Sequence, residues 1–222
     1  MKNSVSGLLA AMSLAAAWVG PTLAAERSLQ QTEQQCHDYS IGADAQIAAC
    51  TPLISLYGNA IENTGIAALT FLTRGTAYAI KGDRERAMAD YREAIRRDSI
   101  PLDAGMREPL LLNDRCWARA IAMLDLDAAL ADCNEALRLR PDFSPARDSR
   151  AFLHLKRGEL KEAIADYDAV LKESPQNYYS MFGRGVAKLR SGDRAGGNAE
   201  IAAAVGAQKG LREEFAAYGV TP

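Results

Sequence analysis

The stretch GTAYAIKGDRERAMADYREAI, residues 75–95, returns later in the chain as AFLHLKRGELKEAIADYDAVL, residues 151–171. Both copies have a glycine followed by an acidic residue, at Gly82-Asp83 and Gly158-Glu159, and an Asp-Tyr pair begins eight residues after that glycine. Glycine readily ends one helix, and an acidic side chain is favourable in the first turn of the next. Each copy therefore predicts two helices joined by a tight turn.

The same frame extends outward over residues 117–141 and, more weakly, over residues 185–204. The last three copies begin at residues 110, 144 and 178, a spacing of 34 residues, and the first begins near residue 68. Residues 102–109 are extra sequence between the first two copies. A fixed period of this length over about 140 residues is typical of a helical repeat array.

This pattern resembles the tetratricopeptide repeat family, whose unit is a pair of antiparallel helices with the same period. Small residues match positions at which helices of that family pack closely, and large residues and two prolines match its filling and closing positions: Gly75, Ala87, Ala94, Phe71, Tyr78, Tyr91, Pro141 and Pro175. The second copy departs from the pattern, with Leu124 at the turn. Ser99 and Lys209 stand where the first and fourth copies should have proline.

The resemblance implies an all-α solenoid of antiparallel helix pairs, with repeats at residues 68–101, 110–143, 144–177 and 178–211. Upstream, residues 26–67 are expected to form a helical cap from helices at 30–39 and 43–56, with Pro52 shortening or bending the second. Downstream, residues 212–222 are expected to form a C-terminal cap. Its amphipathic helix, over residues 211–218, would seal the last repeat.

Residues 1–25 have the pattern of a secretory signal peptide. Lys2 supplies a positive start, residues 5–19 are apolar apart from serine and glycine, and small residues follow Gly20-Pro21. The apolar run is shorter than the roughly 20 residues that span a bilayer. We therefore expect cleavage after Ala24 or Ala25 and a periplasmic or secreted protein that is not inserted in the membrane.

Composition narrows the class of protein. The chain has 222 residues, of which 48% are hydrophobic and 24% charged, and its formal net charge is −2. These values are typical of a folded soluble protein and exclude a disordered chain or a basic nucleic-acid binder. We expect no nucleic-acid partner, and the sequence does not indicate an oligomeric state.

The four cysteines are expected to form disulfides in an oxidising compartment. In a helix pair of this length, facing positions have unit numbers that sum to roughly 31. Cys116 and Cys133, at unit positions 7 and 24, therefore face each other. The second bond would join Cys36 to Cys50 within the cap. Four free buried thiols are the alternative, whereas metal binding by Cys36, His37 and Cys50 lacks a fourth ligand.

The same facing rule applies to a recurrent arginine at unit position 7 and an acidic residue at position 23. The pairs are Arg74 with Asp90, Arg150 with Asp166, and Arg184 with Glu200. We interpret them as ion pairs between the two helices of each repeat, with a row of ligand-binding arginines as the alternative. In the second copy, where Cys116 replaces the arginine, Arg115 or Arg119 is expected to neutralise Asp132.

No catalytic constellation, cofactor motif or metal-site motif stands out in the sequence. His154 lies at a repeat position that the other copies fill with Tyr78, Ala120 or Lys188, which favours a packed histidine over a catalytic one. No phosphate-binding loop, zinc-binding helix motif or nucleophile elbow occurs. We expect a protein that is not an enzyme and needs no cofactor or metal.

In the resembled family, the first helices of successive repeats line a concave groove that binds extended peptides or partner helices. The resemblance implies a module that binds a protein or peptide there, with aromatic anchors and with Arg115 able to hold a carboxylate. The matching positions are Leu72, Thr76, Asp114, Arg115, Ala118, Ser149, Phe152, Tyr179, Phe182 and Val186.

Two alternatives stay open. Phe152 and Phe182 are equally suited to packing only between neighbouring repeats. The whole protein could also be a structural subunit of an envelope assembly, with its convex face or its N-terminal cap as the main contact.

Overall fold

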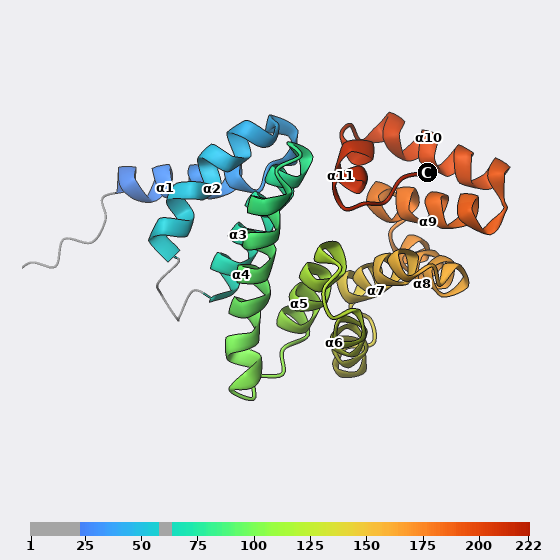
Figure 1. Cartoon of the computed structure of the whole chain (residues 1–222), viewed down its shortest axis with the longest axis horizontal. Helices are drawn as coiled ribbons and strands as arrows, with labels where there is room; N and C mark the ends of the chain where they lie inside the picture. Colours follow the sequence, from blue (N-terminus) through green and yellow to red (C-terminus); the bar gives the residue numbers. More distant parts are fainter. Residues whose placement is uncertain (1–22, 58–63) are drawn as a thin grey trace, which may run out of the picture.

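The structure, a computed structural model, describes residues 23–57 and 64–222. Within these residues the chain forms eleven α-helices, one 3-10 turn and no β-strand. The helices stack in pairs into a curved array (Figure 1). Their bounds are α1 (Leu23–Cys36), α2 (Ala43–Tyr57), α3 (Thr64–Ile80), α4 (Arg84–Asp103), α5 (Pro109–Ala122), α6 (Leu126–Leu139), α7 (Ser144–Arg157), α8 (Leu160–Glu173), α9 (Tyr178–Ser191), α10 (Arg194–Ala207) and α11 (Leu211–Ala217).

The predicted fold class is confirmed: the four repeats are the helix pairs α3/α4, α5/α6, α7/α8 and α9/α10. At the N-terminal end, α1 and α2 pack together, with a 3-10 turn (Tyr39–Ile41) between them, and α2 also packs on α3. Helix α2 continues through Pro52 to Tyr57. The predicted signal peptide lies outside the described residues except for residues 23–25, which begin α1.

Turn glycines end the first helix of three repeats. Gly82, Gly158 and Gly192 have positive φ angles of 78°, 77° and 104°. Such angles are easily adopted only by glycine. The second repeat, which lacks the glycine, turns instead through Met123 and Asp125, with φ angles of 56° and 46°. The departure seen in the sequence thus leaves the hairpin in place but puts two ordinary residues in a left-handed conformation.

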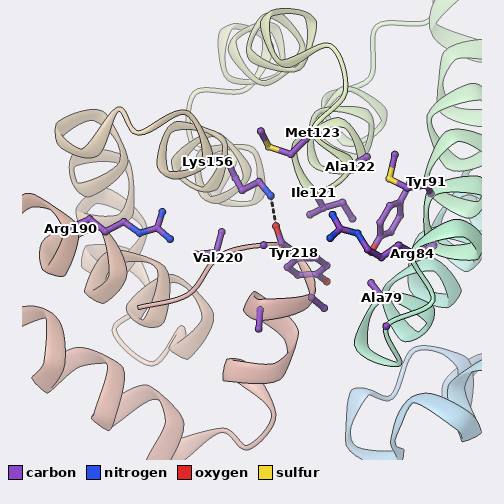
Figure 2. Close-up of a pocket in the computed structure, with 16 residues that line it drawn as sticks. Ala79, Arg84, Tyr91, Ile121, Ala122, Met123, Lys156, Arg190, Tyr218 and Val220 are labelled. Atoms are coloured by element: carbon purple, nitrogen blue, oxygen red, sulfur yellow. Dashed lines mark hydrogen bonds between the residues drawn. The ribbon is translucent and has the colours of Figure 1, made fainter.

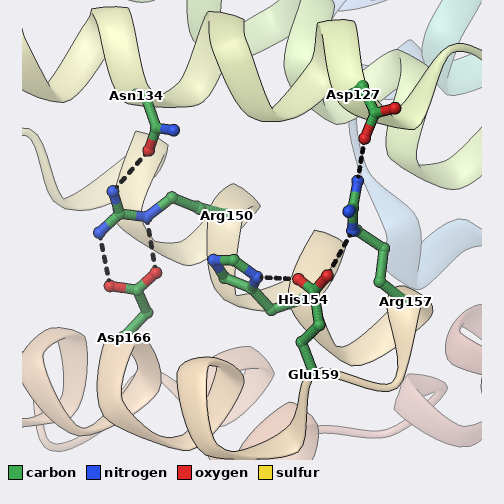
Figure 3. Close-up of polar contacts among 7 residues, drawn as sticks. All are labelled: Asp127, Asn134, Arg150, His154, Arg157, Glu159 and Asp166. Carbon is green, nitrogen blue, oxygen red and sulfur yellow. Dashed lines mark hydrogen bonds and ion pairs between the residues drawn. The ribbon is translucent and has the colours of Figure 1, made fainter.

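The predicted ion pairs link the two helices of each repeat. Arg74 contacts Asp90 at 2.8 Å, Arg150 contacts Asp166 at 2.7 Å (Figure 3), and Arg184 contacts Glu200 at 2.9 Å. In the second repeat, Asp132 accepts hydrogen bonds from both Arg115 and Arg119, as the sequence indicated.

Some of these arginines also bind across to the preceding repeat. Arg150 donates to Asn134 of α6 at 2.8 Å, and Arg184 pairs with Asp168 of α8 at 2.6 Å. His154 is held nearby, with its Nδ1 2.6 Å from a carboxylate oxygen of Glu159 (Figure 3). The row of arginines therefore connects helices within and between repeats.

Both predicted disulfides are present. One joins Cys36 to Cys50 and fastens α1 to α2, and the other joins Cys116 to Cys133 and fastens α5 to α6. All four cysteines are fully buried. The register inferred from the repeat thus places Cys116 and Cys133 correctly across the helix pair.

Helices α9 and α10 approach closely at Gly197, and this contact yields a stability prediction. A Cβ at Gly197 would lie 2.6 Å from the carbonyl oxygen of Gly185 and 2.7 Å from the backbone nitrogen of Leu189. Because backbone cannot move aside as a side chain can, we expect Gly197→Ala to lower the free energy of unfolding by about 1–3 kcal/mol.

The matched control is Gly206→Ala in the same helix, where a Cβ would meet nothing within 4 Å. Alanine is the better helix former, so this change should raise the free energy of unfolding by up to about 1 kcal/mol. Urea unfolding of both variants tests the pair. Equal effects of the two substitutions would contradict close packing at Gly197.

Among residues 23–57 and 64–222, no helix is both long enough and apolar enough to cross a membrane.

Candidate functional site

The ten residues expected to line a groove all lie on α3, α5, α7 and α9, and we call the surface of these four helices the concave face. They do not line an open groove. Seven are buried, namely Leu72, Thr76, Ala118, Ser149, Phe152, Phe182 and Val186, and the other three, Asp114, Arg115 and Tyr179, are half-buried.

Contacts within and between repeats engage three polar members of this set, Asp114, Arg115 and Ser149. Arg115 already holds the carboxylate of Asp132, with N–O distances of 2.6 and 2.8 Å. Ser149 donates to Asn113 at 2.8 Å, and the Asn113 amide donates to Asp114 at 2.9 Å. Burial raises the pKa of Asp114 to about 6. These side chains thus connect α5 to α6 and α7.

Helix α11 covers the aromatic part of the concave face. Phe215 is fully buried, with its ring centroid 4.5 Å from those of Tyr179 and Phe182 and 5.7 Å from that of Phe152. Tilted and edge-on ring pairs at these distances are favourable beyond the area they bury. The helix expected to seal the last repeat therefore packs onto α7 and α9.

Tyr218, the residue after α11, carries this contact across to the first repeats. Its ring lies edge-on to Trp117 of α5, with centroids 5.5 Å apart. Its hydroxyl lies 3.3 Å from the hydroxyl oxygen of Thr76 in α3. Helices α3 and α11, far apart in sequence, are thereby brought together, so the C-terminal segment reaches from the fourth repeat to the first (Figure 1).

The residues after α11 continue along the concave face. Lys156 donates a hydrogen bond to the main-chain carbonyl of Tyr218 (Figure 2), and Arg190 donates to that of Thr221 at 2.8 Å. Val220 between them is 1% exposed. The segment is therefore bound like a peptide, by ring contacts, a buried aliphatic side chain and cations on its carbonyl oxygens.

An opening of about 530 Å³ remains beside this segment. Its walls come from α3, α4, α5, α7, α9 and residues 216–220, and Tyr91, Ile121 and Met123 supply part of its apolar surface (Figure 2). Arg84, Lys156 and Arg190 lie around it. Burial, followed by the charges of the two arginines, lowers the pKa of Lys156 to about 8.

Comparison with known proteins agrees with this geometry. A tetratricopeptide repeat sequence profile matches residues 69–100, which cover most of α3 and α4. The chain therefore contains a tetratricopeptide repeat at these residues. Its repeat array accounts for the helix pairs, the close glycine contacts and the concave face described above.

Similar segments occur in much longer proteins. A human protein named DnaJ homolog subfamily C member 3 is 44% identical over 55 residues, which are 25% of this chain and 11% of that protein. Protein FlbA of Caulobacter vibrioides is 39% identical over 59 residues, 26% of this chain and 10% of FlbA. The chain thus matches only about a tenth of the length of either relative.

Among solved structures, YrrB, described as a tetratricopeptide repeat protein with an unusual peptide-binding site, has a TM-score of 0.47 and 17% sequence identity. The alignment covers 88% of this chain and 97% of YrrB. A structure of MamA has a TM-score of 0.41 and 18% identity over 74% of this chain and 88% of MamA.

The residues that close the concave face could not be recognised from the repeat pattern. Trp117, Lys156 and Arg190 were not among the expected groove positions, and Phe215 and Tyr218 were assigned only to a terminal cap. One signal was present in the sequence. Leu211, Phe215 and Tyr218 form an apolar stripe at helical spacing, and two aromatic side chains bury more surface than a short helix needs to cap a single repeat.

We expect Glu214 to make the docking of α11 dependent on pH. Burial raises the pKa of Glu214 from 4.5 to about 7, although the Tyr218 hydroxyl donates to its carboxylate at 3.1 Å. The phenols of Tyr39, Tyr91 and Tyr179 also lie near this carboxylate. Folding raises the pKa of Glu214, so the protonated side chain favours docking. This contribution is fully present below pH 4.5 and is lost as the pH rises through about 7.

We therefore expect protease cleavage near residues 210–219 to become several-fold faster between pH 5 and pH 8, after correction for the protease's own pH profile. Glu214→Gln should largely remove this dependence, because the amide does not ionise. The exposed neighbour Glu213 provides the control, Glu213→Gln. A Glu214→Gln variant that keeps the full pH dependence would contradict this assignment.

Proposed function

We propose that this protein is a non-enzymatic binding module that holds a peptide, or a segment of a partner protein, on its concave face. The observation that carries the proposal is that this face already holds a segment of its own chain. Aromatic side chains there accept Phe215 and Tyr218, while Lys156 and Arg190 donate to main-chain carbonyls. Every peptide has such carbonyls, so the same contacts suit an extended segment from another protein.

We propose further that the protein works in the periplasm or in the secreted space. The signal-peptide pattern of residues 1–25 supports this location. The two disulfides support it as well, because such bonds persist in oxidising compartments and are rare in the cytosol. The partner would then be another envelope or extracellular protein.

A second candidate, a structural subunit that uses its N-terminal cap or its convex face, is favoured by one observation. Two apolar side chains of the N-terminal cap are exposed, Leu56 of α2 by 56% and Ile41 of the 3-10 turn by 38%. Large apolar side chains grouped at one end of a protein can mark a contact with a partner.

Site-specific photo-cross-linking in cells that produce the full chain distinguishes the two candidates. A cross-linking amino acid would replace Met123 at the concave opening, Leu56 on the cap, or Ala165, which is exposed on the outer helix α8. A concave binding site predicts one discrete adduct from position 123 and none from the others. Adducts confined to position 56 or 165 would favour the structural subunit and contradict concave binding.

A further inference from the structure

The segment on the concave face has the features of a bound ligand. Phe215, Tyr218 and Val220 are 0%, 3% and 1% exposed. Their spacing, Phe-x-x-Tyr-x-Val, puts the two rings one helical turn apart and the aliphatic side chain just beyond the helix end. The rings contact α5, α7 and α9, and Lys156 and Arg190 donate to the main-chain carbonyls of Tyr218 and Thr221.

Two further features favour dissociation of the segment from the repeats without unfolding of the repeats. Helix α11 has seven residues, too few for a stable helix on its own in water. It lies between Gly210 and Gly219, whose φ angles of 85° and 75° are unfavourable for other residues. No disulfide fastens the segment, which is held by its buried side chains and by the hydrogen bonds from Lys156 and Arg190. Its release therefore requires the loss of these contacts and a change at the glycine turns, without breaking a covalent bond.

We propose, on the basis of the proposed function, that the concave face binds aromatic segments of the type Phe-x-x-Tyr followed by a small aliphatic residue. Residues 215–220 occupy this site within the same chain. The physiological partner carries a similar segment that displaces them. The chemistry of the partner follows from the segment that the concave face already binds. That segment presents two rings on one side of a short helix and main-chain carbonyls after the helix. An intramolecular occupant lowers the apparent affinity for such a partner until the occupant is released.

The test uses the full chain and a fluorescent peptide with the sequence of residues 209–222, KGLREEFAAYGVTP. The receptor variant is Phe215→Ala/Tyr218→Ala, which weakens the internal segment, and Tyr218→Ala alone is a milder second variant. The control peptide has alanine at both aromatic positions. Fluorescence anisotropy measures binding, and circular dichroism verifies that each variant is folded.

We expect the peptide to bind the double variant at least about tenfold more tightly than the wild-type chain, and the control peptide to lose at least about tenfold in affinity. Absence of binding to both folded variants, or equal binding of the two peptides, would overturn the proposal. A wild-type dimer that the double variant fails to form would assign the segment to a second copy and overturn it as well. Cross-linking at position 123 tests the proposed function separately, because it does not depend on the partner's sequence.

Discussion

Replacing Phe215 by alanine is expected to free residues 211–222 from the concave face while the repeats stay folded. The Phe215 ring is fully buried against Phe152, Tyr179 and Phe182. Truncating a buried phenylalanine to alanine typically costs about 3–5 kcal/mol. Because α11 is short and glycine-flanked, we expect this cost to appear as local opening of the segment rather than as global unfolding.

Hydrogen exchange measured by mass spectrometry would detect this opening. Peptides from residues 211–222 should exchange about a hundredfold faster or more, since each 1.4 kcal/mol corresponds to a factor of ten, up to the limit set by the segment's present stability. Peptides from α7 and α8 should change far less. Trp117, whose ring contacts Tyr218, should also change its fluorescence as that contact is lost.

The control is Arg212→Ala, an exposed position of the same helix, which should leave exchange nearly unchanged. If Phe215→Ala instead accelerated exchange equally throughout α3–α10, α11 would be an integral part of the cooperative fold. In that case a partner could not displace the segment without unfolding the repeats.

The repeats could be predicted from the sequence because each depends on local chemistry that recurs at a fixed period. The period set the helix register, and the register placed Cys116 opposite Cys133 and Arg150 opposite Asp166 across the same helix pair. Contacts of this kind join residues at most 17 positions apart. Each of these contacts lies within a single repeat unit, so it follows from the pattern of that unit alone.

The covering of the concave face could not be predicted in the same way. Tyr218 meets Thr76 across 142 residues, a contact that depends on the accumulated curvature of four repeats. Small rotations between repeats decide whether α11 reaches α3, and sequence periodicity does not give those rotations. The repeat pattern placed Phe152, Tyr179 and Phe182 on this face, but it did not indicate that α11 covers them.

Loss of the Cys116–Cys133 disulfide is expected to be the other large effect. The bond closes a 17-residue separation, for which restriction of the unfolded chain is worth about 3 kcal/mol. It joins α5 to α6 in the middle of the array, next to repeats on both sides. We expect Cys116→Ala/Cys133→Ala to lower the free energy of unfolding of the whole protein by about 2–4 kcal/mol, measured by guanidinium unfolding.

The Cys36–Cys50 bond provides the matched comparison because its separation, 14 residues, is nearly the same. Chain restriction therefore contributes about equally at the two sites. However, in a repeat array each unit contacts mainly its neighbours, and α1 and α2 lie at one end. Cys36→Ala/Cys50→Ala should thus loosen α1 and α2, seen as faster local hydrogen exchange, with a smaller change in the main unfolding transition.

The stability that the two disulfides contribute also provides a test of the proposed location. A chain that lacks residues 1–25 and stays in a reducing cytoplasm should have both bonds open, and its unfolding midpoint should match that of the variant without any of the four cysteines. The exported chain should gain stability through oxidation, chiefly through Cys116–Cys133. Equal stability of the exported and retained chains would contradict a structural role for the disulfides, and with it one of the two arguments that the protein works outside the cytoplasm.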